Sequence, residues 1–275
     1  MSRIWQITGR NFTGKSTLAI SDLLGKCAYA ELDAGSFERT ATGENPDITI
    51  TEFYPPLTAL EDIGVVRTDS AGKSGGGGIS IVHTYKGWQE NMVGINAWVL
   101  ATCADDAISR GIFDTASLLW DTMQNATRQR AQASGLNADQ LADRLKTLEF
   151  QEPNAQFYGI VSAFKRAKKD LILINHEKEE WKQNQPTGKM IPDGWRKAED
   201  SVDVHLRMSI EAGVITAEIK KAGGIWKGPQ LIGKKIAEPT LNKVSDYLAA
   251  ADKLLRAEIG LPDTEEETLE MAGAI

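Results

Sequence analysis

Residues 9–16 have the types and spacing of a phosphate-binding loop. They read Gly-Arg-Asn-Phe-Thr-Gly-Lys-Ser, which fits the pattern G-x-x-x-x-G-K-S. In such a loop the backbone N–H groups and the N-terminus of the following helix meet the negative charge of a phosphate chain. Lys15 would neutralise the β- and γ-phosphates, and the Ser16 hydroxyl would ligate Mg²⁺. The residues expected to contact the nucleotide are Gly9, Arg10, Asn11, Phe12, Thr13, Gly14, Lys15, Ser16 and Thr17.

Three acidic residues at predicted strand ends are candidates for the second half of this site. Asp114 follows a short apolar run and precedes small hydroxyl residues and a helix. We expect Asp114 to hold Mg²⁺ through water or to orient the attacking water. Glu31 and Asp33 lie at the end of an earlier strand, where parallel sheets bind ligands. A solvated strand-end acid is an equally good interpretation of Glu31 and Asp33.

Asn175 and His176 follow the clearest buried strand of the chain, at residues 170–174. A continuous apolar run of this kind suits a central parallel strand that is covered on both faces. A polar pair at its carboxyl end can sense the γ-phosphate and couple it to the following loop. The alternative is a pair that only caps the strand.

The elements that must position these residues form a parallel α/β pattern. A strand at 4–7, a helix at 18–24 and a strand that ends near Asp33 make a βαβ unit, which favours a parallel sheet. Further elements are predicted at 48–54 (strand), 84–107 and 157–169 (helices), 202–208 with 214–220 (a hairpin) and 240–257 (an amphipathic helix). The sequence therefore predicts an α/β fold with a mainly parallel central sheet flanked by helices, followed by a C-terminal β-hairpin and helix.

The chain divides into one large nucleotide-binding domain and a short C-terminal part. We place the domain at residues 1–236, with a polar helical insertion at about 121–150 that breaks near Ser134. Residues 237–275 carry the C-terminal helix and an acidic tail, which has six acidic residues and no basic one between positions 258 and 270. Such a tail is typical of a solvated segment, and it either competes with nucleic acid or is inert.

Composition narrows the setting of the protein. The net charge of −7 over 275 residues argues against a general binder of polyanions. Cys27 and Cys103 match no metal-ligand spacing, so we expect free thiols in a reducing compartment. The N-terminus enters a core strand almost at once, and no apolar run is long enough to cross a membrane. We therefore expect a cytoplasmic protein with no membrane partner.

Basic and aromatic residues alternate in the segment 181–199. It contains Trp181, Lys182, Lys189, Trp195, Arg196 and Lys197. On a mobile loop this mixture suits single-stranded nucleic acid, because bases stack on aromatic rings and lysines neutralise phosphates. A substrate lid or a plain loop is the alternative. Residues 69–78 are expected to form a second mobile loop, and residues 220–235 hold five lysines and no acid.

The order of the motifs resembles that of RecA-type ATPases. The phosphate loop is followed by the segments Ala-Glu-Leu-Asp-Ala at 30–34, Ile-Phe-Asp-Thr-Ala-Ser at 112–117 and Leu-Ile-Asn-His-Glu-Lys at 173–178. Within this class the chain looks most like compact phage-encoded nucleotide-binding proteins, some of which are single-strand annealing recombinases. The resemblance covers roughly residues 1–235, and only the phosphate loop is highly specific.

The resemblance implies roles for individual residues and partners. Lys15 and Ser16 would bind phosphate and Mg²⁺, Asp114 would be the second acid, and His176 would sense the state of the nucleotide. Lys220 and Lys221 would reach the nucleotide of a neighbouring subunit. The implied cofactors are ATP and Mg²⁺, and the implied partners are single-stranded DNA, further copies of the chain in a ring or filament, and a single-strand binding protein.

One departure from the RecA pattern concerns the catalytic base. Proteins of that class carry a glutamate shortly after the acid of the second strand, whereas Ala34 and Gly35 follow Asp33 here. Glu31, Asp33 or Glu38 would have to substitute, or hydrolysis is slow. The candidate catalytic residues are therefore Lys15, Asp114, Glu31, Asp33 and His176.

The sequence thus predicts an ATPase that acts on single-stranded DNA in phage recombination or replication. The first alternative is an assembly or loading factor that binds nucleotide with little turnover, as the absent glutamate suggests. A packaging or helicase-type motor is the second, although 275 residues leave little room for the extra domain that such motors carry. A small-molecule kinase ranks below these. ATP is preferred by resemblance, since no guanine-reading motif of the Asn-Lys-x-Asp kind is present.

Overall fold

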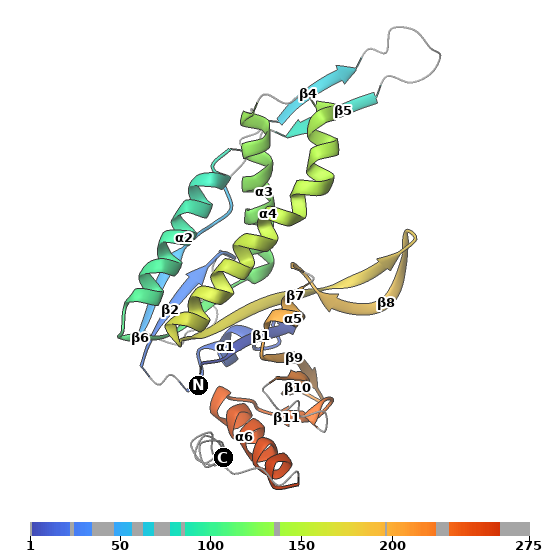
Figure 1. The fold of residues 1–275 in the computed structure, drawn as a ribbon. Coiled ribbons are helices and arrows are strands. Elements are labelled where there is room, and N and C mark those ends of the chain that lie inside the picture. Colours follow the sequence, from blue (N-terminus) through green and yellow to red (C-terminus); the bar gives the residue numbers. More distant parts are fainter. Residues whose placement is uncertain are drawn as a thin grey trace, which may run out of the picture.

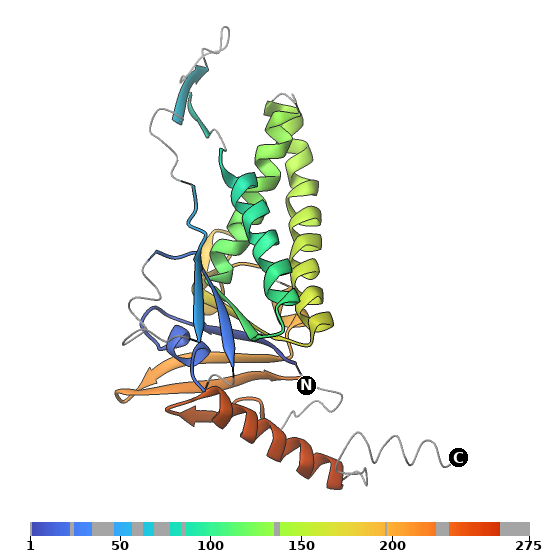
Figure 2. The same cartoon turned by 90° about the vertical axis from the view of Figure 1, so that its left-hand side faces the viewer.

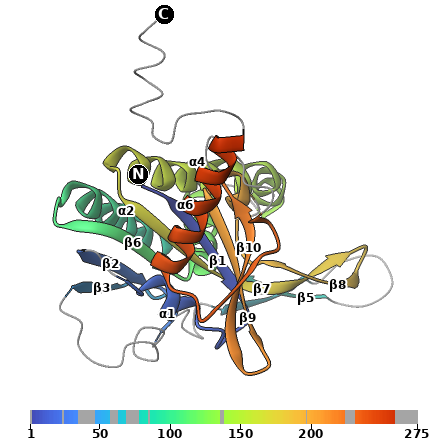
Figure 3. The ribbon, with the colours of Figure 1, turned by 90° about the horizontal axis from the view of Figure 1, so that it is seen from below.

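The computed structural model describes residues 2–22, 25–34, 47–56, 63–68, 78–83, 86–134, 138–195, 197–223 and 231–258. Helices lie on both faces of a central β-sheet (Figures 1 and 2). One face carries α2 (Trp88–Ala104), α3 (Ala116–Ala133) and α4 (Ala138–Ala167), and the other carries α1 (Lys15–Ala19) and α6 (Leu241–Glu258). Seen from below, α6 crosses the sheet close to α1 (Figure 3).

The central sheet is parallel in its middle and antiparallel at one edge. Its strands are β1 (Ile4–Gly9), β2 (Lys26–Glu31), β3 (Ile48–Glu52), β6 (Ile108–Asp114), β7 (Asp170–Lys182), β8 (Gln185–Pro192), β9 (Val204–Glu211), β10 (Val214–Ala222) and β11 (Lys235–Ala237). The order is β11-β10-β9-β1-β7-β6-β2-β3, and β8 pairs with β7 outside this path. All pairs from β9 to β3 are parallel, while β10 runs antiparallel to β9 and β11. A separate antiparallel pair joins β4 (Ile63–Thr68) and β5 (Gly78–His83).

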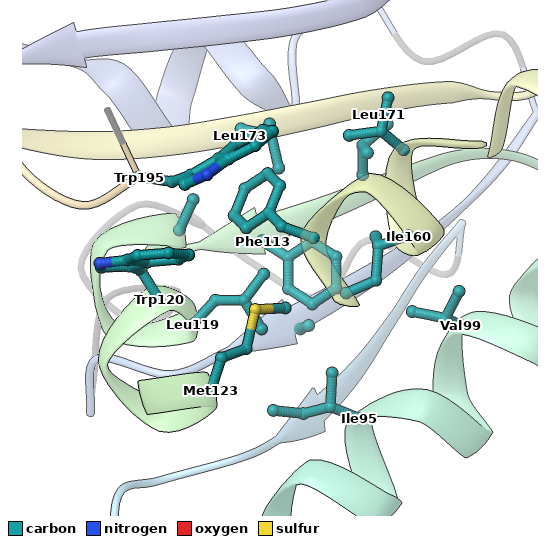
Figure 4. Close-up of a cluster of buried hydrophobic side chains, with 14 of the residues drawn as sticks. Ile95, Val99, Phe113, Leu119, Trp120, Met123, Ile160, Leu171, Leu173 and Trp195 are labelled. Carbon is teal, nitrogen blue, oxygen red and sulfur yellow. The ribbon is translucent and has the colours of Figure 1, made fainter. Parts of the chain in front are cut away.

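The two faces of the sheet form two hydrophobic cores because side chains alternate along each strand. In β7, Leu171 and Leu173 face the core under α2, α3 and α4, whereas Ile172 and Ile174 face the core under α1 and α6. Figure 4 shows the first core, where Phe113 of β6 lies among side chains from the three helices. Phe113 and these four side chains of β7 are fully buried. The burial of each one stabilises the fold by about 1.5–3 kcal/mol relative to an exposed side chain.

A glycine in β6 allows α4 to lie close to the sheet. A Cβ atom on Gly111 would fall 2.4 Å from the ring of Phe164, which is itself fully buried. Only a residue without a side chain fits under this ring. Gly111 therefore sets the distance between β6 and α4.

The predicted fold class is confirmed. The structure has a mainly parallel central sheet flanked by helices, and a C-terminal hairpin (β9 and β10) and helix (α6) follow. The predicted first helix is shorter than expected, because α1 ends at Ala19. The predicted helices at 121–149 and 157–169 are also different in extent, since α4 runs without interruption through Pro153. The burial of Phe157, Ile160 and Phe164 on its inner face outweighs the local cost of the proline.

The prediction of a loop at 181–199 was wrong. Strand β7 continues past His176 to Lys182 and turns into β8, so that this segment is mostly an antiparallel hairpin that ends in the short helix α5 (Ala198–Ser201). The turn residues Gln183 and Asn184 both have positive φ, at 51° and 62°. Such pairs make tight two-residue hairpin turns whose twist matches that of the strands. The hairpin projects from the body of the molecule (Figure 1).

Several predicted features lie outside the described residues. They are residues 69–77 of the expected second mobile loop, Glu38, Arg196 and the acidic tail after residue 258. None of the helices in the described part of the chain combines the length and the apolar character needed to span a membrane.

Candidate nucleotide-binding site

The carboxyl ends of β1, β2 and β6 meet at one edge of the sheet, which the longer strand β7 crosses at His176. Gly9 pairs with His176, and Glu31 pairs with Asp114, whereas β7 continues to Lys182. A cavity of about 510 Å³ opens at this edge. It is lined by Asn11, Phe12, Thr13, Gly14, Lys15, Ser16, Thr17, Asp33, Asp114, His176 and Ile215.

The loop between β1 and α1 requires glycine at two positions, Gly9 and Gly14. A Cβ atom on Gly9 would fall 2.7 Å from the carbonyl oxygen of Met208 and 2.7 Å from Oγ1 of Thr13. Gly14, which caps α1, has φ of 80°, in the left-handed region. The Thr13 hydroxyl donates to the carbonyl oxygen of Arg10 at 2.8 Å, and this bond within the loop stabilises its conformation. The loop is thus held in a curled shape with its N–H groups near the cavity.

Lys15 lies inside this curl. Its side chain is 7 % exposed, and its Nζ donates to the carbonyl oxygens of Gly9 at 3.1 Å and Arg10 at 2.8 Å. Burial lowers the pKa of Lys15, while the nearby carboxylates of Asp114, Glu177 and Asp33 act in the opposite direction. A polyphosphate in the cavity would offer this ammonium group stronger acceptors than the two carbonyl groups.

Ser16 and Asp114 form an oxygen pair at the centre of the cavity. The Ser16 hydroxyl donates to Oδ2 of Asp114 at 2.6 Å, and the phenol of Tyr29 donates to the same oxygen at 2.5 Å. Asp114 is 2 % exposed and ends β6, and the peptide bond that joins it to Thr115 is cis. A hydroxyl and a carboxylate side by side are oxygen ligands of the kind that Mg²⁺ prefers, so the residues present fit this ion.

Asp33 and His176 lie next to each other in the lining of the cavity. Oδ2 of Asp33 lies 3.8 Å from Nε2 of His176. Burial lowers the pKa of His176, and the charge of Lys15 lowers it further, whereas Asp33, Asp114 and Asp193 raise it. The imidazole is therefore neutral at pH 7. Its Nδ1 is buried and has no hydrogen-bond partner among the described residues.

Glu31, the other acid of the second strand, is placed differently. It is 3 % exposed, accepts a hydrogen bond from the Tyr54 hydroxyl at 3.2 Å and does not line the cavity. Asn175 also points elsewhere, because it accepts from Gln6 at 3.2 Å and donates to the carbonyl oxygen of Asp193 at 2.9 Å. Of the two candidate acids Glu31 and Asp33, Asp33 is the one that lines the cavity.

Lys220 and Lys221 lie at a second cavity. This cavity, of about 1300 Å³, lies against the β7–β8 hairpin and is also lined by residues of β1, β9 and β10. Nζ of Lys220 donates to Glu218 at 2.6 Å, and Lys221 donates to the backbone carbonyl of Glu199. Neither lysine lines the cavity that holds Lys15.

The two tryptophans of the predicted nucleic-acid segment have different surroundings. Trp181 on the hairpin is 62 % exposed and lines the second cavity. Trp195 also borders this cavity, but it is 4 % exposed and packs against Phe157 at a centroid distance of 4.4 Å and against Trp120 at 6.4 Å. The prediction that Trp195 offers a stacking surface was therefore wrong, because this ring fills the core under α3 and α4.

Three residues around the nucleotide cavity were missed from the sequence. The sequence offered a partial signal for Tyr29, because a tyrosine in a buried strand needs a hydrogen-bond partner for its hydroxyl. Ser117 accepts from the His176 N–H at 3.2 Å and donates to the carbonyl oxygen of Asp193 at 2.9 Å, which ties three elements together. Ile215 reaches the cavity from β10, and no local signal connects it to the phosphate loop.

A phosphate loop at the end of a central parallel strand, with the hydroxyl of Ser16 bonded to the buried Asp114 beside it, defines a P-loop nucleotide-binding protein. The profile of the AAA domain family matches residues 2–234, and the chain belongs to this family. No curated protein matches the sequence. Among solved structures the chain is similar to the RadB recombinase, with 12 % identity, a TM-score of 0.42 and 86 % of each chain covered.

Proposed function

We propose that the protein is a RecA-like ATPase that binds ATP and Mg²⁺ in the 510 Å³ cavity and acts on single-stranded DNA in recombination or replication. The observation that carries the proposal is the Ser16–Asp114 pair, held 2.6 Å apart beside the buried Lys15. Residues 1–236 would form the ATPase domain, and residues 237–275 its C-terminal extension. A phage origin and a single-strand binding protein as partner belong to the same proposal.

Each residue at the cavity has a role in this reaction. The loop N–H groups and Lys15 would bind the phosphates, and Ser16 with Asp114 would hold Mg²⁺, which would supply a Lewis acid to polarise the phosphoryl oxygens. Asp33, which lines the cavity, would orient the attacking water and accept its proton. Neutral His176 would donate or accept one hydrogen bond beside the terminal phosphate through its Nε2, because its Nδ1 is buried.

Steady-state hydrolysis of ATP with Mg²⁺, with and without single-stranded DNA, tests the proposal. We expect Lys15→Ala to abolish turnover and to weaken ATP binding, because the phosphates lose their buried cation. Lys26→Ala is the matched control, since Lys26 is exposed at the start of β2. Wild-type ATP affinity in the Lys15→Ala variant would contradict the proposed site.

The choice between Asp33 and Glu31 as the catalytic acid is tested by a pair of amide substitutions. Asp33→Asn should lower turnover by about 10²–10⁴-fold and retain ATP binding, because it removes a proton acceptor in the transition state. Glu31→Gln should retain most of the turnover. The reverse result would assign the role to Glu31.

The DNA-binding part of the proposal rests on the β7–β8 hairpin. Trp181 is exposed there, and Lys182 and Lys189 line the same cavity. Trp181→Ala should weaken binding of an oligonucleotide about 5–150-fold, the loss of about one to three kcal/mol of base stacking. Tyr247→Ala on α6, which removes an aromatic ring that is 47 % exposed, is the control. Equal affinities in wild type and the Trp181 variant would move the DNA site elsewhere.

Assembly into a ring or filament is supported by the positions of Lys220 and Lys221, which lie outside the nucleotide cavity of their own chain. If they complete a neighbour's site, Lys15→Ala and the double variant Lys220→Ala/Lys221→Ala should each be inactive. Mixing the two should restore about a quarter of the activity, since one in four random head-to-tail interfaces is then intact. No recovery in a mixture that does co-assemble would exclude this role.

The second candidate function is an assembly or loading factor with little turnover. The described residues that line the cavity include two acids, Asp33 and Asp114, and no glutamate. The absence of a glutamate from this lining favours a protein with slow hydrolysis. Tight ATP binding with turnover near background, even with DNA present, would select it. A packaging or helicase-type motor would instead show ATP-driven movement along DNA.

A further inference from the structure

The tip of the β9–β10 hairpin brings one apolar side chain to the nucleotide cavity. Ile215, the second residue of β10, lines the cavity and is 37 % exposed. Its Cδ1 atom lies 3.1 Å from the position that a Cβ atom on Gly14 would take. Ile215 therefore lies against the phosphate loop at the point where α1 begins.

The hairpin holds Ile215 in a defined place. Ile215 pairs with Ile210 across the hairpin, and its carbonyl oxygen accepts a hydrogen bond from the N–H of Glu238 at 2.8 Å. Lys235 of β11 bonds to Glu211 at 2.6 Å near the tip. Because the backbone is bonded on both sides, the side chain is positioned before any ligand arrives.

The order of the strands gives the direction of a bound nucleotide. Asp114 and His176 belong to β6 and β7, which lie on one side of β1, and Ile215 reaches the cavity from the other side, through β9 and β10. The terminal phosphates of a bound nucleotide would lie at the Asp114 end, where the Ser16–Asp114 pair would hold Mg²⁺. The rest of the ligand must then extend away from this end, toward the hairpin.

We propose that Ile215 is the wall against which the base of the nucleotide packs, an inference that rests on the proposed function. Phe12 and Ile215 are the large apolar side chains of the described cavity lining, and Phe12 belongs to the segment that wraps the phosphates. An aliphatic side chain gives a base dispersion contacts and excludes water, but it forms no hydrogen bond with the base edge.

This wall predicts which nucleotides the site accepts. The flat faces of adenine and guanine offer an aliphatic wall nearly the same contact area. Strong discrimination requires buried polar groups that pair with the base edge, and contact with an apolar wall does not supply it. The site should therefore bind purine nucleoside triphosphates with little preference between ATP and GTP.

The test compares ligands with and without a base. Binding of ATP, GTP and inorganic tripolyphosphate, each with Mg²⁺, is measured by calorimetry on wild-type protein and on Ile215→Ala. We expect wild type to bind ATP and GTP within about threefold of each other. Ile215→Ala should weaken the affinities for ATP and GTP by about 5–10-fold, because part of one apolar contact is lost. The affinity for tripolyphosphate should stay unchanged.

Two further variants serve as controls. Ile210→Ala removes the same side chain from the same hairpin at a position that is 52 % exposed and does not line the cavity, so ATP binding should not change. Ile215→Leu keeps the apolar surface and should bind ATP within about twofold of wild type.

The results separate this inference from the function on which it rests. Wild-type ATP affinity in Ile215→Ala, an equal loss for tripolyphosphate, or a preference of more than about tenfold for one purine would overturn the base wall alone. If wild type bound neither ATP nor tripolyphosphate, the proposed function would fail and this inference with it.

Discussion

At the scale of single residues, the site depends on one carboxylate with two donors. Oδ2 of Asp114 accepts hydrogen bonds from Ser16 and from Tyr29, and both the acceptor and the Tyr29 ring are buried. Hydrogen bonds to a charged group contribute more than neutral ones, and a buried charge that loses a donor is costly. Tyr29 therefore matters both to folding and to the orientation of Asp114.

Tyr29→Phe should lower the free energy of unfolding by about 1.5–3 kcal/mol, because Asp114 loses one charged hydrogen bond. It should also weaken Mg²⁺-dependent ATP binding, since the carboxylate is then held by Ser16 alone among the bonds described. Urea unfolding and calorimetry measure the two effects. Tyr247→Phe is the control, because it changes an exposed phenol on α6 and should alter neither quantity. Equal stability of Tyr29→Phe and wild type would contradict the argument.

A second residue makes stability depend on pH. His205 is 5 % exposed, and burial, followed by Lys220 and Lys221, lowers its pKa to about 4. The unfolded chain, with a pKa near 6.5, binds the proton more readily, so stability should fall as the pH drops from about 6.5 to 4. The contribution of His205 to this loss is about 3 kcal/mol at most, because each pKa unit corresponds to 1.36 kcal/mol.

The measurement for His205 is the free energy of unfolding at pH 7 and pH 4.5, for wild type and His205→Asn. Asparagine keeps a polar group beside Thr8, whose hydroxyl lies 3.0 Å from Nε2 of His205, but it does not titrate. The variant should lose less stability between the two pH values than wild type. Equal losses in both proteins would show that His205 does not carry this dependence.

At the scale of elements, the contact between β6 and α4 depends on the absence of a side chain at Gly111. Gly111→Ala should cost about 1–3 kcal/mol of stability or more, since the new Cβ atom overlaps the buried ring of Phe164. Gly159→Ala is the opposite case. Gly159 lies within α4 with nothing within 4 Å of the added atom, so this change should stabilise the protein by about 0.5–1 kcal/mol. Thermal unfolding of both variants checks the pair, and a stable Gly111→Ala would mean that α4 can shift.

At the scale of the whole molecule, the C-terminal helix completes the core beneath the N-terminal phosphate loop. The N–H of Leu241 donates to the Ser21 hydroxyl at 2.9 Å, and the N–H of Asn242 donates to Asp22 at 3.1 Å, so that the start of α6 is capped by the segment after α1. Leu241 and Val244 are buried in the core that also contains Leu18 of α1. The two ends of the chain therefore stabilise each other.

Two leucines of α6 test this closure. Leu241→Ala should lower stability by about 2–4 kcal/mol, because Leu241 is 3 % exposed and its loss leaves a cavity. Leu254→Ala, at a position that is 68 % exposed, should change stability by less than about 0.5 kcal/mol. Chemical denaturation compares them, and similar values for the two variants would show that α6 is not part of the cooperative core.

The sequence by itself determined the phosphate loop, the parallel α/β class and the position of Asp114 at a strand end. These features depend on short-range spacing, since a strand, a glycine-rich turn and a helix follow one another within about twenty residues. The same local periodicity predicted the β9–β10 hairpin and α6 to within a few residues.

The tertiary structure decided which of the candidate side chains share a cavity. Asp33 rather than Glu31 lines it, Trp195 fills a core, Lys220 and Lys221 lie at a different cavity, and Tyr29 and Ile215 join the site. These outcomes depend on the order of strands in the sheet and on the face to which each side chain points. Both are set by contacts between residues far apart in the chain, such as the pairing of β1 with β7 and β9, and no local pattern encodes them.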